Sequence, residues 1–224
     1  MLVVAKAPVA GLVKTRLGRV VGMERAAELA AAALLDTITA CASAYGARRC
    51  HLALHGVLAE SVRADELMAA TDEWVVHPQR GDDFAARLVN AHHDASAASG
   101  APVVQVGMDT PHLDAATLTK AGSRLLHRDD AVLGPAADGG WWLLGVGGPH
   151  LLDGLGEVPM STEHTGDLTR ESLLLAGARI SDVETLRDVD EVGDADSVAS
   201  AAPGSRFAQA YLEAYLEACL EVAR

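Results

Sequence analysis

The segment that most restricts the fold of this chain occupies residues 103–111 and reads Val-Val-Gln-Val-Gly-Met-Asp-Thr-Pro. Its apolar, β-branched start predicts a buried strand of a parallel sheet. The strand ends before Thr110, because Pro111 cannot donate to a ladder and moves the preceding residue towards extended or turn geometry. Asp109 is therefore expected at the carboxyl end of a parallel strand, where open α/β sheets bind their ligands.

Asp109 has a structural and a functional interpretation. Taken alone, an Asp shortly before a Pro most often begins a turn or caps a helix. A second segment, Leu-Gly-Pro-Ala-Ala-Asp-Gly-Gly-Trp-Trp at residues 133–142, carries Asp138 among three glycines and a proline. Two carboxylates on loops of one sheet edge favour the functional interpretation, in which Asp109 holds a divalent cation.

Short apolar segments alternate with helical periodicity along the chain. Strands are expected at residues 2–5, 50–54, 73–76, 103–106, 131–133, 142–146 and 178–185, and helices at 23–43, 60–70, 192–199 and 205–222, with three more beginning near residues 82, 114 and 161. This order predicts an α/β fold with a doubly wound, mostly parallel mixed sheet, helices on both faces and an antiparallel strand at 142–146. With 224 residues and no interdomain linker, we expect one domain over residues 1–224.

Local patterns predict three helix starts and one polar face. Asp82 is expected to cap one helix, Asp114 a second, and Ser161 or Thr162 a third, because their side chains can accept hydrogen bonds from the first turn. His92 and His93 are adjacent and point in different directions on a helix, so they are expected on a solvated face rather than in a metal site.

Charge and composition exclude several classes of function. The net charge of −13 argues against nucleic acid as a partner. No apolar window is long enough for a membrane span, and Lys6 comes too early for a signal peptide. Three scattered cysteines, Cys41, Cys50 and Cys219, are expected to be reduced packing residues of a cytoplasmic protein.

Positive charge gathers at the start of the chain, which suits a small anion. Against Glu24 alone, the first 25 residues contain Lys6, Lys14, Arg16, Arg19 and Arg25. The loop after the first strand, punctuated by Pro8 and Gly11, can offer backbone N–H groups, Lys14 and Arg16 to a diphosphate. The loop lacks the P-loop pattern, and an ordinary surface loop with solvated charges is the alternative.

The last quarter of the chain holds two further features. Asp188 and Asp190 project the same way in an extended chain, although capping of the helix at 192–199 would also explain them. The final helix carries a stripe of Phe207, Tyr211, Tyr215 and Cys219 that is expected to dock on the core. The oligomeric state is open, and this tyrosine-striped helix could form a homodimer.

Four segments together resemble a bacterial family of small GT-A-fold proteins, usually named glycosyltransferases and including an arsenosugar-biosynthesis type, whose fold is shared with nucleotidyltransferases. They are Ala-Lys-Ala-Pro-Val-Ala-Gly-Leu-Val-Lys-Thr-Arg-Leu at 5–17, Gly-Met-Asp-Thr-Pro-His-Leu at 107–113, Leu-Gly-Pro-Ala-Ala-Asp-Gly-Gly-Trp at 133–141 and Asp-Val-Asp at 188–190. The resemblance covers nearly the whole chain and implies a nucleotide-diphospho-sugar transferase fold.

The resemblance also implies roles for individual residues. Asp109 would bind a metal, Mg²⁺ or Mn²⁺, with Asp190 and Asp188 adding carboxylates; Lys6, Pro8, Gly11, Lys14, Thr15 and Arg16 would bind the nucleotide phosphates; Gly139, Gly140 and Trp141 would face the acceptor. Met108 stands in the middle of the acidic motif, so one carboxylate is available there. Met160 stands where the family often has an aromatic residue.

The predicted reaction is metal-dependent transfer of a sugar from a nucleotide-diphosphate sugar to a small-molecule acceptor. A carboxylate would accept the acceptor's proton, with Asp138 as the first choice and Glu163 as the second. One alternative is nucleotidyl transfer from a nucleoside triphosphate with release of pyrophosphate, as in the guanylyltransferases of cofactor biosynthesis. A non-catalytic nucleotide-binding module is another.

Overall fold

The computed structural model describes residues 1–189 and 192–222. Its strands are β1 (Leu2–Lys6), β2 (His51–His55), β3 (Val75–Pro78), β4 (Val103–Val106), β5 (Asp130–Pro135), β6 (Trp141–Val146) and β7 (Arg179–Asp182). They form a seven-stranded sheet in the order β3-β2-β1-β4-β6-β5-β7. Neighbouring strands are parallel except where β6 pairs with β4 and β5. The predicted mixed, mostly parallel sheet and its antiparallel strand are confirmed.

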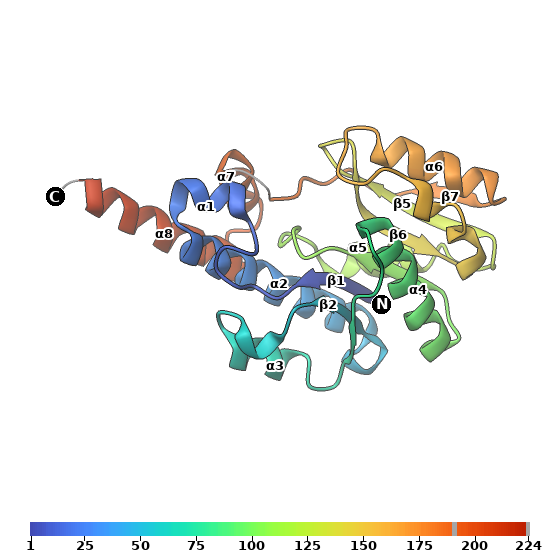
Figure 1. Cartoon of the computed structure of the whole chain (residues 1–224), viewed down its shortest axis with the longest axis horizontal. Helices are drawn as coiled ribbons and strands as arrows, with labels where there is room; N and C mark the ends of the chain where they lie inside the picture. Colours follow the sequence, from blue (N-terminus) through green and yellow to red (C-terminus); the bar gives the residue numbers. More distant parts are fainter. Residues whose placement is uncertain (190–191, 223–224) are drawn as a thin grey trace.

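Helices cover both faces of this sheet (Figure 1). They are α1 (Thr15–Val21), α2 (Met23–Tyr45), α3 (Ala64–Ala70), α4 (Phe84–Ser99), α5 (Ala115–Gly122), α6 (Thr165–Leu175), α7 (Val192–Ala201) and α8 (Arg206–Val222), with short 3-10 turns at Ala47–Arg49, Leu58–Glu60, Pro149–Leu152 and Leu155–Glu157. Helices α2 and α5 pack on the face that carries Val3 and Val104. Helices α4 and α6 pack on the face that carries Leu2 and Leu144. Both faces are therefore buried, as the continuous apolar strands require.

Helix α2 is the longest element of the core. Its alanines, among them Ala27, Ala30 and Ala31, are fully buried, and their small size lets the helix lie close to the sheet. Among the described residues, α2 is also the one helix whose length and composition would allow it to cross a membrane. Because 72% of that apolar window is buried inside the fold, its hydrophobicity is explained by core packing.

A third core joins the two ends of the chain. Leu17 of α1 and Leu29 of α2 pack with Val198 of α7 and Phe207 of α8. Phe207 is fully buried and stacks on Tyr211 with ring centroids 6.4 Å apart. Figure 1 shows α1, α7 and α8 together at one end of the molecule, with α6 at the other. Docking of the last helix is confirmed at these two aromatic positions, while the side chains of Tyr215 and Cys219 lie outside the described residues.

Residues 183–189, which we call the crossing segment, run along the carboxyl edge of the sheet from β7 towards α7 (Figure 1). The N–H of Val183 donates to Leu133, and Leu186 both donates to Pro135 and accepts from Ala137. At its far end the Val189 N–H donates to the carbonyl of Asp109 at 3.0 Å. The crossing segment therefore connects the loops that follow β5 and β4.

The structure corrects the predicted helix starts. Residues 15–21, expected to lie in or after a loop, form α1. Asp83 rather than Asp82 caps α4, accepting from the Ala86 N–H at 2.8 Å. Neither Ser161 nor Thr162 caps α6, which begins after His164. Several neighbouring residues can each act as an N-cap, and the geometry of the loop before the helix determines whether one of them does so.

His92 was predicted on a solvated face, and this prediction is wrong. Its side chain is 1% exposed on the sheet-facing side of α4, and neither ring nitrogen has contact with solvent. Burial lowers the pKa of His92 to about 3, so the ring is neutral at physiological pH. His93 is exposed, as expected.

Candidate functional site

The sheet has its topological switch point between β1 and β4. The chain leaves β1 through α2 towards β2 and β3 on one side, and β4 follows α4 on the other side. Open α/β sheets bind ligands in the crevice outside the carboxyl ends of two such strands, because the connecting helices lie on opposite faces and leave the edge open. In this structure the loop after β1 and the loop after β4 meet at this point of the sheet edge.

Lys14 closes the loop after β1 and points across the switch point. Its backbone has φ 46° and ψ 41°, a left-handed conformation that is costly for a residue with a Cβ atom. The side chain is 8% exposed, and its ammonium lies 2.6 Å from Oδ1 of Asp109. The same ammonium donates to the carbonyl of Val189. Three chain segments therefore meet at the Lys14 ammonium.

Asp109 keeps part of its carboxylate open to solvent. Its side chain is 38% exposed, and its backbone carbonyl is held by Val189. It does not cap the following helix, because Asp114 does so by accepting from the Thr117 N–H at 2.7 Å. Burial lowers the pKa of His112 in the same loop, and Lys14 places a positive charge beside Asp109.

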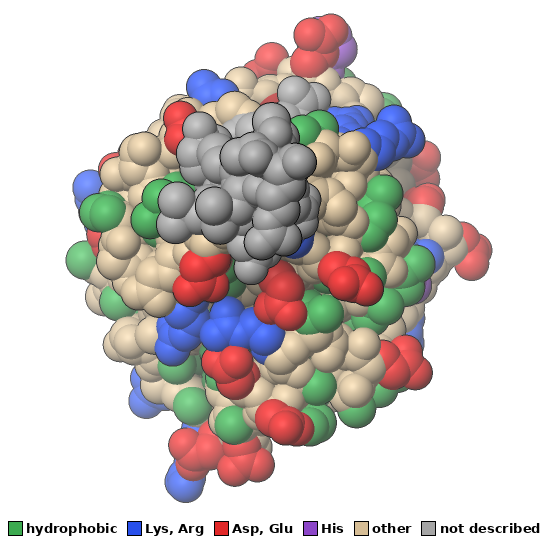
Figure 2. All heavy atoms as spheres, turned by 90° about the vertical axis from the view of Figure 1, so that its left-hand side faces the viewer, with side chains coloured by type: hydrophobic (Ala, Val, Ile, Leu, Met, Phe, Trp, Pro, Cys, Tyr) green, Lys and Arg blue, Asp and Glu red, His purple; other side chains and the backbone are tan. Residues whose placement is uncertain are grey.

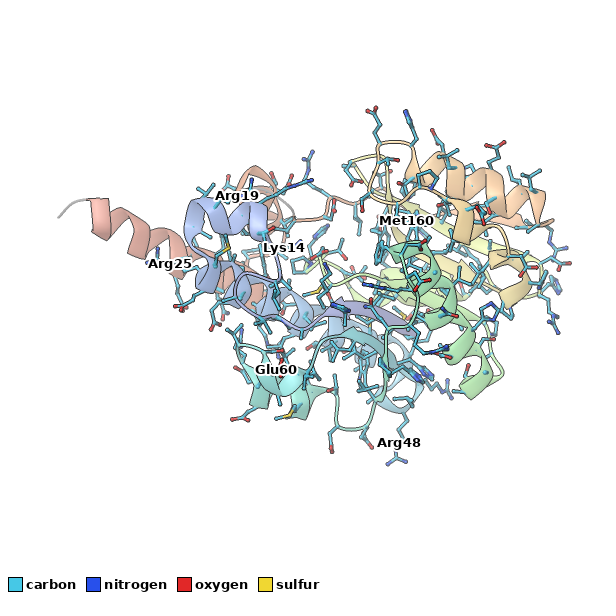
Figure 3. All side chains as sticks on the ribbon, in the orientation of Figure 1. Lys14, Arg19, Arg25, Arg48, Glu60 and Met160 are labelled. Atoms are coloured by element: carbon cyan, nitrogen blue, oxygen red, sulfur yellow. The ribbon has the colours of Figure 1, made fainter. Side chains whose placement is uncertain are left out.

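Two of the other N-terminal cations, Arg16 and Arg25, lie on different helices, α1 and α2. Arg16 is exposed in the first turn of α1. Arg25 lines a groove with Arg63 and Arg206 beside α8, and Figure 3 shows Arg25 on the far side of α1 from Lys14. Figure 2 shows acidic side chains around the basic ones on this end of the molecule. Arg25 is thus separated from Lys14, which lies at the switch point beside Asp109.

The remaining residues of the predicted phosphate loop have mixed exposure. Lys6, Gly11 and Thr15 are exposed, whereas Pro8 is buried and its carbonyl accepts from the Val62 N–H at 2.9 Å. The backbone of Lys6 donates to the sulfur of Met108 at 3.4 Å. The methionine in the acidic motif therefore ties the β1 loop to the β4 loop.

The glycine-rich loop after β5 rests on the start of α6. Oδ1 of Asp138 accepts from the Gly140 N–H at 2.8 Å, so this carboxylate also shapes its own turn. Gly139 has φ 89°, and a Cβ atom there would lie 2.1 Å from the Glu163 carbonyl oxygen. The Gly166 N–H donates to Gly139 at 2.8 Å. Only glycine permits this approach of two backbones.

The two candidate bases therefore lie on loops that touch each other. Glu163 has a side chain that is 82% exposed, with its carboxylate 3.6 Å from the His164 ring. Trp141, predicted on the acceptor side, is half-buried and donates to Thr169 of α6 at 3.1 Å. Figure 3 shows Met160 on this side of the molecule, across from Lys14.

The crossing segment links this loop pair to the Lys14 pair. Leu186 bonds Ala137 and Val189 bonds Asp109, and three residues of extended chain span roughly 10 Å. Asp188 is half-buried between these points, and Asp190 lies outside the described residues. The carbonyl of Val189 was not anticipated from the sequence, because a main-chain acceptor leaves no side-chain signal.

Among the side chains that the structure describes, Asp109 is the carboxylate at this edge that is placed to contact a divalent cation. The described residues contain no cluster of three His, Cys, Asp or Glu side chains that could hold a metal. The Lys14 ammonium is nevertheless held by two oxygens, Oδ1 of Asp109 and the carbonyl of Val189. Mg²⁺ prefers oxygen ligands and commonly uses one or two carboxylates together with substrate phosphates, so Asp109 suits such an ion.

Comparison with solved structures gives the same architecture. A protein from Desulfovibrio desulfuricans G20 that carries the name nucleotide-diphospho-sugar transferase is 26% identical, with a TM-score of 0.78 over 94% of this chain and 91% of that one. A nucleotidyl transferase from Methanothermobacter thermautotroptrophicus is 20% identical, with a TM-score of 0.55 over 88% and 94%. A cytidylyltransferase from Leptospira borgpetersenii serovar Hardjo-bovis is 12% identical, with a TM-score of 0.59 over 97% and 94%. The predicted nucleotide-diphospho-sugar transferase fold is confirmed.

Sequence comparison identifies the family. No curated protein matches the chain significantly. The model of a family described as "Uncharacterized protein conserved in bacteria (DUF2064)" matches residues 37–162, more than half of the chain. This range includes the Asp109 loop and the glycine-rich loop that carries Asp138. The chain therefore belongs to the bacterial family DUF2064.

Proposed function

We propose that this protein is a cytoplasmic glycosyltransferase that moves a sugar from a nucleotide-diphosphate sugar to a small-molecule acceptor. The observation that carries the proposal is the 2.6 Å contact between Lys14 and Asp109 at the switch point. A buried ammonium beside a partly open carboxylate gives one group for an anion and one for a cation. A diphosphate with a bound divalent ion needs both.

Each residue of this pair has a separate role in the proposal. Lys14 would bind the diphosphate and neutralise the charge that develops on it as the sugar–oxygen bond breaks. Arg16, exposed next to it in α1, would reach the outer phosphate oxygens. Asp109 and the Val189 carbonyl would hold Mg²⁺ or Mn²⁺, which supplies Lewis-acid stabilisation of the leaving diphosphate when it is bound.

The glycine-rich loop is the proposed acceptor side. Asp138 or Glu163 would accept the proton of the acceptor hydroxyl, because both project from the loops that Gly139 and Gly166 hold together. Asp138 remains the first choice, although one of its oxygens is engaged by Gly140. Glu163 has the more exposed carboxylate.

Product identification tests the proposal. The protein is offered nucleotide-diphosphate sugars or nucleoside triphosphates with Mg²⁺ or Mn²⁺, and the released product is identified. Release of nucleoside diphosphate supports glycosyl transfer. Release of pyrophosphate would instead indicate nucleotidyl transfer, the activity named in two of the structural neighbours. Binding without either product would leave a nucleotide-binding module.

A matched pair of variants locates the chemistry. Asp109→Asn should remove turnover, whereas Asp94→Asn should retain it, because Asp94 forms an ion pair of the same length with Arg80 at 2.6 Å on the exposed side of α4. Equal activity in the two variants would show that the reaction does not depend on Asp109 at the switch point.

A further inference from the structure

We propose that the Lys14 ammonium occupies the cation position of the site when no nucleotide is bound, so that a divalent ion and Lys14 compete for Asp109. This inference rests on the proposed function, because it concerns the same pair of residues. It predicts an order of events: the nucleotide draws Lys14 away before, or as, the divalent ion reaches the carboxylate.

The geometry of the ammonium is that of a bound cation. Two oxygens from different chain segments, Oδ1 of Asp109 and the carbonyl of Val189, converge on it. A carboxylate and a backbone carbonyl are the donors that hard divalent ions take in proteins. The lysine side chain is 8% exposed, so little water reaches the ammonium from its own side.

Electrostatic repulsion would prevent the Lys14 ammonium and a divalent ion from contacting Asp109 at the same time. An ammonium and a divalent ion that share one carboxylate oxygen would lie within a few ångströms of each other, where like charges repel strongly at a partly buried site. The free protein is therefore expected to bind divalent ions weakly, although it carries a carboxylate at the correct edge of the sheet.

A nucleoside diphosphate would remove the repulsion between the ammonium and the divalent ion. Lysine has a flexible four-carbon stem, so its charged head can turn from a carboxylate to a nearby phosphate without backbone movement. The phosphate then neutralises the ammonium and adds its own oxygens as metal ligands. The strained left-handed backbone at Lys14 fixes where the stem begins, so that the head travels between these two partners.

Mn²⁺ binding measured without any substrate tests the competition. Titration of Mn²⁺ alone, followed by water-proton relaxation, is expected to show weak binding to the wild type and roughly tenfold or tighter binding to Lys14→Met. Lys14→Gln is a second neutral variant if the first folds poorly. The gain should vanish when Asp109→Asn is added to Lys14→Met, because the carboxylate is then gone.

A control removes the effect of net charge. Arg80→Met deletes one positive charge from an ion pair of the same 2.6 Å length that is exposed instead of buried. Its Mn²⁺ affinity is expected to equal that of the wild type. Equal affinities in wild type and Lys14→Met, or a gain in Lys14→Met that survives the loss of Asp109, would overturn the competition.

The nucleotide arm separates this inference from the proposed function. With ADP, CDP, GDP or UDP present in turn, one of them should raise the Mn²⁺ affinity of the wild type to the level of Lys14→Met alone. Tight Mn²⁺ binding by the wild type that no nucleotide changes would overturn the competition and leave the metal-dependent transferase intact. Turnover without any divalent ion would instead show that the transfer reaction needs no metal. The competition between Lys14 and the metal would then also be excluded.

Discussion

The ammonium of Lys14 lies 2.6 Å from the carboxylate of Asp109 because β1 and β4, which precede these residues, are neighbours in the sheet. Each strand delivers its loop to the same edge, and the chain turns away from that edge in opposite directions. The contact is thus a direct consequence of strand order. Four predictions test this pair, the glycine-rich loop and the buried face of α4.

Asp109→Asn should lower turnover on the order of 100-fold or more, because it removes the charge that would hold the divalent ion. The fold should persist, since an amide oxygen can still accept a hydrogen bond from Lys14. Steady-state kinetics and thermal unfolding check the two halves of this prediction. Normal activity in a folded variant would exclude a role for Asp109 in the reaction.

Lys14→Gly should be more stable than Lys14→Ala by about 1 kcal/mol, because glycine adopts the left-handed conformation without strain and alanine does not. Both substitutions remove the same ion pair, so the comparison isolates the backbone. Denaturant unfolding of the two variants gives the difference. An alanine variant as stable as the glycine variant would argue against the positive φ at this position.

Gly139→Ala should destabilise the protein by about 2 kcal/mol or more, because the new Cβ atom would lie 2.1 Å from the Glu163 carbonyl oxygen. Gly100→Ala is the control: with φ 64° and ψ 14° it is left-handed, and a Cβ atom there would have no neighbour within 4 Å. The control should lose only about 1 kcal/mol, from backbone strain. Equal losses in chemical denaturation would mean that the two loops do not touch.

Stability should fall as the pH is lowered below about 6.5, partly through His92. The folded-state pKa of His92 is lowered to about 3 by burial, whereas the unfolded chain takes up the proton near pH 6.5. The unfolded state therefore binds more protons between these values, and the contribution of this histidine to stability is lost progressively as the pH falls through that window.

Between pH 7 and pH 5, this single histidine should reduce the free energy of unfolding by about 2 kcal/mol. His92→Gln should flatten the pH dependence, whatever its effect on stability at pH 7. His93→Gln, which changes the exposed neighbour, should leave the slope of the wild type unchanged. Urea unfolding at the two pH values measures both slopes.

Much of the fold could be predicted from the sequence because the buried strands are short, apolar and bounded by Gly, Pro or Asp. The antiparallel β6 was recognisable because Gly139 and Gly140 leave too little chain for a helical crossover. Helix α1 was missed, since Lys14 adopts a left-handed conformation that a sequence pattern does not reveal in a non-glycine residue. His92 was misplaced because neighbouring histidines look alike until a helix is docked.

The candidate site was predictable to the extent that sheet topology governs it. Lys14 and Asp109 were expected at one edge because parallel strands end together, and their contact agrees with that expectation. The use of Asp138 in its own turn and the Val189 carbonyl beside Lys14 could not be derived, because both depend on main-chain hydrogen bonds. Arg25 lies away from Lys14 because it belongs to α2, which begins only after the whole of α1.

The crossing segment has a consequence for the order in which this protein becomes competent. All seven strands are already present once β7 has been synthesised, yet the Val189 contacts to Lys14 and Asp109 require residues that come later. A nascent chain that has just completed its sheet therefore still has an unfinished rim. The rim is complete only after residues 183–189 have been synthesised and have paired with β5 and with the loops that follow β5 and β4.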